Sequence, residues 1–212
     1  MTKHLPILAL LCLAGLVPAA EIVIRDVRAA VLVRATDFDF DLSAPNRTQS
    51  GSDAFNSGTG LELGVRYGFS GTGSSVGLIV GGDLNADWYS YDGDDGLANY
   101  GLRGCVAGGW SPIDRWTFML EGGLGAGYSS LSLPASDASA AFEADGSSLA
   151  YDARLVTMFR MSKRWAVHGH LGYMAASNDL SGDDIDITID QGGLFAGVGV
   201  TWMFSTRPTR LE

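Results

Sequence analysis

The chain has 212 residues, including 29 glycines, and carries 24 acidic against 14 basic side chains, a formal net charge of −10 at pH 7. The basic residues form no stripe. The composition therefore argues against nucleic acid as a partner, because phosphate binding needs clustered Lys and Arg. The length fits one domain.

Residues 1–20 have the features of a secretory signal peptide. Lys3 supplies a positive start, residues 5–17 are an apolar run too short to cross a membrane as a helix, and small residues at 18–20 suit cleavage. After residue 20 no apolar run reaches the ~18 residues that a transmembrane helix needs. Export also leaves Cys105 as the single cysteine, so no internal disulfide is expected.

The exported part alternates apolar and polar residues, which is the period of a β-strand whose two faces meet different environments. In residues 61–69 every odd position is apolar or aromatic, and residues 194–204 repeat the pattern at even positions. We place eight strands at residues 29–40, 60–69, 75–87, 97–110, 116–129, 149–160, 165–176 and 193–204.

The connections between these strands alternate between long and short. The long ones are residues 41–59, 88–96, 130–148 and 177–192, and the short ones are 70–74, 111–115 and 161–164. This rhythm predicts an all-β fold, a closed eight-stranded antiparallel up-and-down transmembrane β-barrel with short periplasmic turns and long outer loops. We assign the barrel to residues 29–204, a periplasmic lead-in to 21–28 and a C-terminal tail to 205–212.

Aromatic residues gather at the two ends of the predicted strands. One group lies beside the short turns or at the last strand end: Phe69, Trp110, Trp116, Phe159, Trp165, Trp202 and Phe204. The other group lies at the opposite ends: Tyr89, Tyr91, Tyr100, Tyr128 and Tyr151. Two aromatic bands one strand length apart are typical of two membrane interfaces, because indole and phenol rings have an apolar body and a polar tip.

The phase of the alternation predicts which residues face lipid. The opposite phase would place Arg66, Arg103 and Arg154 in hydrocarbon, at a cost of roughly 2–4 kcal/mol each at the midplane. In the first strand Val31 and Val33 are expected to point outward, with Arg34 inward. The predicted belt is Leu61, Leu63, Val65, Leu78, Val80, Leu102, Val106, Leu120, Leu124, Leu155, Val167, Leu171, Val198 and Val200.

The same phase turns a set of charged and polar residues into the barrel. They are Glu62, Arg66, Asp83, Arg103, Glu121, Asp152, Arg154, His168 and His170. Eight strands enclose room only for side chains, and an inward charge survives only when it is paired and hydrogen-bonded. We therefore expect a salt-bridged plug, with a gated ion path as the alternative. Many inward positions are glycine, which leaves space for these long side chains.

Two motifs could be mistaken for chemical sites. His168 and His170 lie on one strand face, but no third ligand follows at a suitable spacing, so we expect a lumenal pair bonded to carboxylates rather than a metal site. The run 122–127 is Gly-rich but has no Gly-Lys-Ser ending and no following helix, so it is no phosphate loop. We predict no metal and no cofactor.

The acidic excess lies mainly in the connections. The residues are Asp92, Asp94 and Asp95 in one, and Asp179, Asp183, Asp184, Asp186 and Asp190 in another. We expect them to provide solubility, with divalent-cation contact near an anionic lipid surface as the alternative.

The strands, the aromatic bands and the closing segment that ends in Trp202-Met203-Phe204 resemble the small eight-stranded outer-membrane barrels of the OmpA/OmpX/opacity-protein type. The resemblance covers residues 29–204 and implies an integral outer-membrane protein of a Gram-negative bacterium. It also implies that the barrel-assembly machinery reads the terminal aromatic strand. The residues after Phe204 depart from that pattern.

These observations predict a monomeric protein without catalytic activity, whose outer loops serve adhesion, surface contact or envelope integrity. The expected partners are outer-membrane lipids, lipopolysaccharide and, during biogenesis, the assembly machinery. One alternative is a lipid-modifying barrel enzyme, but the His-x-Ser-Asn signature of lipid A deacylases is not matched, because residue 170 is His where Ser is needed. The other alternative is a small ion-conducting barrel.

Overall fold

The computed structural model describes residues 21–45, 47–52, 57–70, 76–91, 94–113, 115–133, 141–182 and 184–205. The predicted signal peptide at 1–20, most of the predicted turn at 70–74 and residues 206–212 of the tail lie outside the described residues. None of the described residues forms a helix with the length and apolar character needed to cross a membrane.

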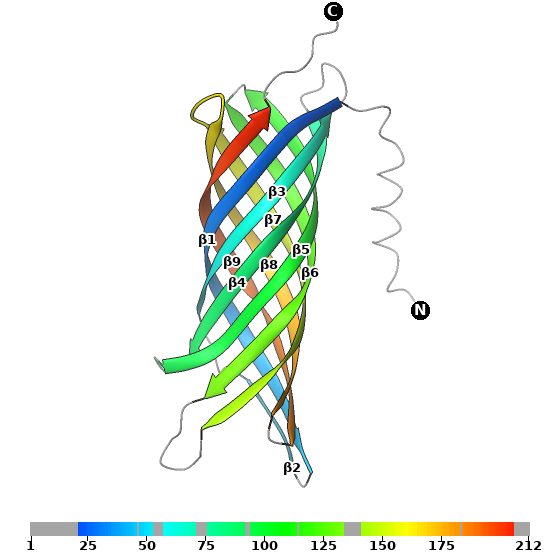
Figure 1. The fold of residues 1–212 in the computed structure, drawn as a ribbon, viewed down its shortest axis with the longest axis vertical. Coiled ribbons are helices and arrows are strands. Elements are labelled where there is room, and N and C mark those ends of the chain that lie inside the picture. Colours follow the sequence, from blue (N-terminus) through cyan, green and yellow to red (C-terminus); the bar gives the residue numbers. More distant parts are fainter. Residues whose placement is uncertain are drawn as a thin grey trace, which may run out of the picture.

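Nine antiparallel strands form one continuous sheet (Figure 1). They are β1 (Glu21–Ala44), β2 (Arg47–Ser52), β3 (Gly58–Ser70), β4 (Val76–Tyr91), β5 (Asp94–Ile113), β6 (Trp116–Leu133), β7 (Phe142–Arg160), β8 (Trp165–Gly182) and β9 (Ile185–Ser205). Neighbours in sequence are neighbours in space, and β1 pairs with β9 from Arg25↔Ser205 to Ser43↔Asp186. The sheet therefore closes, and the predicted closed up-and-down barrel is confirmed.

The small strand β2 stands outside the ring, so eight of the nine strands close it. It pairs only with the far end of β1, from Asp39↔Ser52 to Ala44↔Arg47. We call the end of the barrel that holds this hairpin the loop end, and the end that holds residues 115 and 161–164 the turn end. Strand β1 begins and β9 finishes at the turn end (Figure 1).

The first strand is longer than predicted. Residues 21–28, assigned above to a periplasmic lead-in, belong to β1 and pair with β3. The reason is visible in the alternation, because Asp26 and Arg28 are buried on the same face of β1 as Arg34. The predicted outward Val31 and Val33 are exposed, as that phase requires.

The strands also extend far into the segments predicted as long connections. Residues 41–59, 88–96, 130–148 and 177–192 all contain strand, and the loops between strands are short at this end too. A tilted transmembrane strand needs only ~9–11 residues. The six longest strands have 18 to 24 residues, so the barrel is about twice as tall as a bilayer requires.

The apolar face changes sides along these strands without any change of phase. In β1 the outward residues run from Val31 and Val33 to Asp37 and Asp39, while Phe38 is buried inside. In β8 the outward series likewise runs from Leu171, which is exposed, to Asp179, while Leu180 is buried. The prediction of connections at the loop end is therefore wrong in these segments. Their apolar residues lie on the inner face, so the strands lack the apolar outer face that marks a membrane strand.

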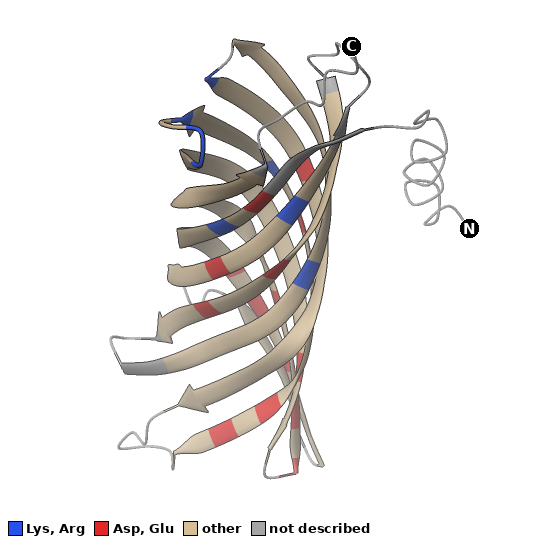
Figure 2. Ribbon diagram, turned by 45° about the horizontal axis from the view of Figure 1, so that its top comes forward, with Lys and Arg blue, Asp and Glu red and all other residues tan. Residues whose placement is uncertain are grey.

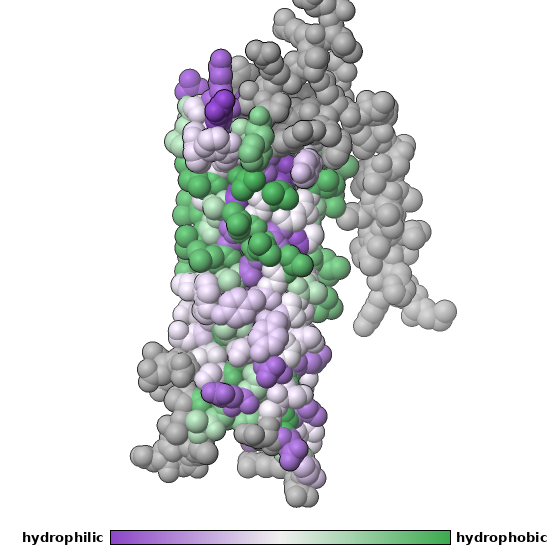
Figure 3. Space-filling view, viewed as in Figure 1, coloured by the Kyte–Doolittle hydropathy of each residue, from purple (hydrophilic) through white to green (hydrophobic). Residues whose placement is uncertain are grey.

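The predicted lipid belt is confirmed as an exterior surface. None of its members is buried, and all but Leu78, Val80, Val106 and Val167 are exposed. In Figure 3 apolar residues dominate the upper half of the visible face, a paler band follows near mid-height, and hydrophilic residues lie toward the loop end.

Two apolar clusters fill the barrel near its ends. The loop-end cluster consists of Phe38, Tyr89, Leu97, Leu131, Ala144, Leu180, Ile187 and Ile189. The turn-end cluster consists of Ile79, Ala107, Met119, Val156, Met158, Ala166 and Met203. The polar part of the lumen lies between them.

Candidate functional site: the lumenal charge network

The predicted inward charges come from neighbouring strands and meet in register. Asp83 of β4 pairs with Arg103 of β5, and Glu121 of β6 pairs with Arg154 of β7. Arg66 reaches across from β3, where its neighbour on the inner face is Gly64. Period-2 alternation aims all of these side chains at the barrel axis, which is why they form one cluster.

Two carboxylates form the centre of the network, and three arginines surround them. Glu121 accepts hydrogen bonds from Arg66 Nη2 at 3.1 Å, Arg103 Nη1 at 2.9 Å and Arg154 Nε at 2.8 Å. Asp83 accepts from Arg66 Nη2 at 2.9 Å and Arg103 Nη1 at 2.6 Å. Both carboxylates are almost fully buried, at 1% and 3% exposure, so these bonds replace the water that each charge has lost.

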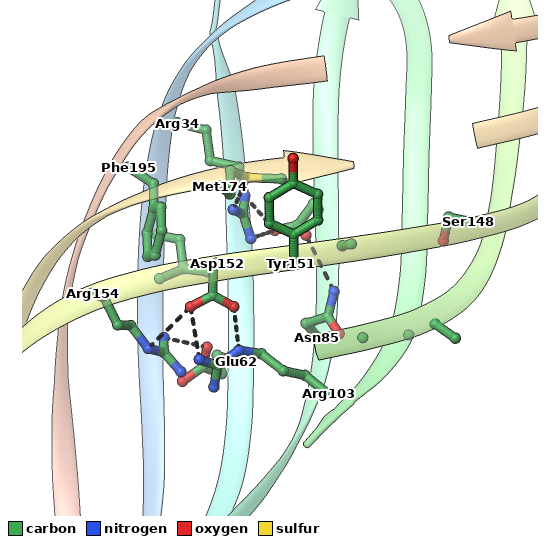
Figure 4. Close-up of a pocket in the computed structure, with 16 residues that line it drawn as sticks. Arg34, Glu62, Asn85, Arg103, Ser148, Tyr151, Asp152, Arg154, Met174 and Phe195 are labelled. Carbon is green, nitrogen blue, oxygen red and sulfur yellow. Dashed lines mark hydrogen bonds and ion pairs between the residues drawn. The ribbon is translucent and has the colours of Figure 1, made fainter. Parts of the chain in front are cut away.

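Two further carboxylates complete the network. Asp152 receives a two-point bond from Arg103, with Nη2 to Oδ1 at 2.7 Å and Nε to Oδ2 at 2.5 Å. Glu62 accepts a 2.7 Å hydrogen bond from Arg154 Nη1. Figure 4 shows Asp152 between Arg103 and Arg154 on the inner side of the wall.

Two additional ion pairs were absent from the predicted site. Arg28 Nε lies 2.8 Å from Asp26 Oδ1, and Arg34 Nη2 lies 2.6 Å from Asp87 Oδ1. Arg34 also stacks over the Phe195 ring at 5.4 Å. The signal for the first pair was the alternation of residues 26–34, which becomes clear only when residues 21–28 are treated as strand.

The two histidines face the lumen, but their predicted bonds to carboxylates are wrong. His168 Nδ1 shares a hydrogen bond with Thr201 Oγ1 at 2.9 Å, and His170 Nε2 has no hydrogen-bond partner. The His168 and His170 rings stack with centroids 5.9 Å apart. The nearby carboxylates are already bonded to arginines, which explains why none reaches the imidazoles.

One group of possible metal ligands occurs among the described residues, formed by Asp83, Cys105 and Glu121. Both carboxylates of this group already bind guanidinium groups. Cys105 is buried, as the alternation predicted.

Glycines make room for the network at close quarters. A Cβ atom at Gly123 would collide with the guanidinium of Arg103, and one at Gly64 would collide with the carboxylate of Asp83. A Cβ at Gly197 would meet the imidazole of His170. At these three positions glycine leaves the space that the side chain opposite occupies.

A small polar cavity remains beside the network. It measures about 60 Å³, and all eight strands of the ring contribute to its wall, with Arg34, Asp87, Asp152 and Met174 among the lining residues (Figure 4). This volume is large enough to hold water. Apolar clusters lie toward both ends of this polar layer.

No protein-family model and no curated protein matches this chain. Solved structures do match it. Neisserial surface protein A is 13% identical, with 85% of this chain and 97% of that chain covered and a TM-score of 0.45. The attachment invasion locus protein Ail of Yersinia pestis is 13% identical, with 81% and 97% covered and a TM-score of 0.33. The outer membrane protease OmpT from Escherichia coli is 7% identical, with 84% and 97% covered and a TM-score of 0.46.

Proposed function

We propose that this protein is an integral, non-catalytic barrel of the bacterial outer membrane that holds a rigid barrel extension above the membrane for surface contact, adhesion or envelope integrity. The observation that carries the proposal is the change of apolar face along the strands. The turn-end half presents an apolar belt outward and buries charges, whereas the loop-end half presents carboxylates outward and buries an apolar cluster. Each half suits a different solvent, lipid for one and water for the other.

Aromatic residues mark where the two halves meet. Trp88, Tyr100 and Tyr128 are exposed on adjacent strands, and the Trp88 indole donates a 3.3 Å hydrogen bond to the Tyr100 hydroxyl. Trp110 and Trp165 are exposed near the turn end. Rings of this kind prefer the membrane interface, so the two bands delimit the lipid-embedded part.

The filled lumen and the two histidines favour a non-catalytic role. A lipid-modifying enzyme requires catalytic groups that reach lipid, whereas His168 and His170 are buried and face the lumen. A conducting barrel requires a continuous polar path, and the apolar clusters that lie toward both ends of the polar layer therefore favour a closed lumen.

Fractionation of a Gram-negative host that expresses the full chain tests the location. We expect the protein in the outer-membrane fraction, with an electrophoretic mobility that changes on heating because the folded barrel resists detergent. In intact cells an impermeant thiol reagent should label Asp41→Cys at the loop end but leave Lys163→Cys at the turn end unlabelled. A soluble periplasmic protein, or the reverse labelling, would contradict the proposal.

A further inference from the structure

The basic side chains that the structure describes lie in two places on this acidic protein. Among the lysines and arginines whose side chains the structure describes, five line the lumen and the remaining four lie at the turn end. Those four are Arg115, Arg160, Lys163 and Arg164. Arg160 shares the inner face of β7 with Met158, whereas Arg115, Lys163 and Arg164 are exposed, and we call these three the basic rim. The turn between β7 and β8, which holds two of them, is blue in Figure 2, whereas red segments lie on the strands toward the bottom of that view.

The basic rim is a continuous patch because two neighbouring turns are joined. The backbone N–H of Arg160 donates a 2.8 Å hydrogen bond to the carbonyl of Arg115. The turn that follows is held by Ser162, whose hydroxyl accepts bonds from the backbone N–H of Arg164 and Trp165. Arg115, directly before β6, and the β7–β8 turn that carries Lys163 and Arg164 are therefore neighbours at one edge of the barrel.

Each turn presents a cation directly before an exposed tryptophan. Arg115 precedes Trp116 at the start of β6, and Arg164 precedes Trp165 at the start of β8. Trp116 packs on Phe159 with ring centroids 5.0 Å apart, so the aromatic band continues beneath the cations. An indole lies at the interface of a bilayer, and this places the preceding cation at the depth of the lipid headgroups.

The four cations at the turn end have no partners in the described part of the chain, unlike the five in the lumen. None of them takes part in an ion pair, and the buried Nε of Arg160 makes no hydrogen bond. No acidic side chain that the structure describes is exposed at the turn end. A patch of unpaired cations at headgroup depth attracts phosphate, and guanidinium groups bind it through two parallel bonds.

We propose that the basic rim binds the phosphate headgroup of an anionic phospholipid in the leaflet that surrounds the turn end. The acyl chains lie against the aromatic band and the apolar belt below it. The inference rests on the membrane location proposed above, and it adds a preferred lipid class and the residues that select it.

Native mass spectrometry of the purified protein in detergent tests the site without reference to its cellular location. Phosphatidylglycerol and phosphatidylcholine with the same acyl chains are the two probes. We expect the wild-type protein to retain phosphatidylglycerol at least ~10-fold better, because each basic residue adds to the attraction for an anionic headgroup. The triple variant Arg115→Gln, Lys163→Gln, Arg164→Gln should bind both lipids equally, and salt should weaken only the wild-type preference.

Three controls separate the site from general effects. The first control changes three charges at the loop end and should keep the preference for phosphatidylglycerol; it is the triple variant Asp37→Asn, Asp39→Asn, Asp41→Asn. The second control preserves the rim charges and should also keep the preference; it is the double variant Arg115→Lys, Arg164→Lys. Glycerol phosphate at the lipid concentration should not compete, since it lacks the acyl chains. Equal retention of both lipids by the wild-type protein, or an unchanged preference in the triple Gln variant, overturns the proposal. Heat-dependent mobility confirms that each variant is folded.

Discussion

Gly122 and Gly123 are neighbours in β6 that lie on opposite sides of the barrel wall. The first faces outward, with its nearest would-be contact to a Cβ atom 3.9 Å away at the carbonyl of Asp152. The second faces the guanidinium of Arg103. A methyl group in place of a Cα hydrogen would therefore clash with Arg103 at Gly123, whereas at Gly122 it would meet no close neighbour.

Gly123→Ala should therefore destabilise the protein by about 1–3 kcal/mol, because the added methyl group displaces Arg103 from Asp152. Gly122→Ala is the matched control and should change the free energy of unfolding by less than about 0.5 kcal/mol. Urea unfolding in lipid vesicles, followed by tryptophan fluorescence, measures both. Equal effects of the two substitutions would show that Arg103 has room to move.

Arg103 bonds to Asp83, Glu121 and Asp152 at once. Arg103→Ala should cost on the order of 3–5 kcal/mol, because buried carboxylates lose a partner that solvent cannot replace. Arg115→Ala at the rim, which breaks no ion pair, should cost less than about 0.5 kcal/mol. Adding Asp152→Asn to Arg103→Ala should recover part of the loss, and strict additivity of the two changes would argue against a shared network.

At the scale of the strand, the alternation of inward and outward residues continues unchanged while the outer face changes from apolar to acidic. The outward residues of β1 change from valine at 33 to aspartate at 37. Over the same stretch of the strand the inward residues change from arginine at 34 to phenylalanine at 38. The strand keeps its register with β9 there. The chemical environment changes while the backbone geometry continues.

Spin labels on one face of β1 should report this change. A nitroxide at Val31 should be relaxed by oxygen, which dissolves in lipid, and one at Asp41 by a water-soluble nickel complex, in a Cys105→Ala background. Both residues point outward, so orientation cannot explain a difference. If both labels respond to oxygen alike, the extension lies in the membrane and the proposed boundary at the aromatic residues is wrong.

At the scale of the whole molecule, the lumen is a stack of layers. An apolar cluster lies toward each end, and the charge network with its small cavity lies between them. A charged layer alone would leave open the question of conduction, because water and ions move through polar networks. We propose that the apolar layers add the barrier that the network does not supply.

The purified protein should therefore show no steady conductance in planar bilayers. Arg103→Ala should remain silent as well, because its effect is confined to the central layer while Phe38 and Met119 keep their places in the two clusters. Large, steady currents from the wild-type protein would contradict the filled lumen. Currents that arise only in Arg103→Ala would show that the network, and not the apolar clusters, closes the barrel.

The sequence by itself determined the barrel, its strand count in the ring and the phase of its walls. Alternation with a period of two is a local property, and an incorrect phase would expose Arg66 or Arg154 to lipid, so these features follow from residues and their spacing. It also predicted the members of the central network, since their strands and phase were known. The many glycines at inward positions also predicted that the long charged side chains pack closely inside the barrel.

Only the tertiary structure decided how far the strands continue and which groups meet. The loop-end segments carry their apolar residues on the inner face and lack an apolar outer face, so no local pattern distinguishes them from connections until neighbouring strands pair with them. The partner of His168 is a threonine on β9, 33 residues away, because arginines from three other strands had already taken the carboxylates. Such choices depend on competition among side chains that closure of the barrel brings together, and sequence spacing does not encode that competition.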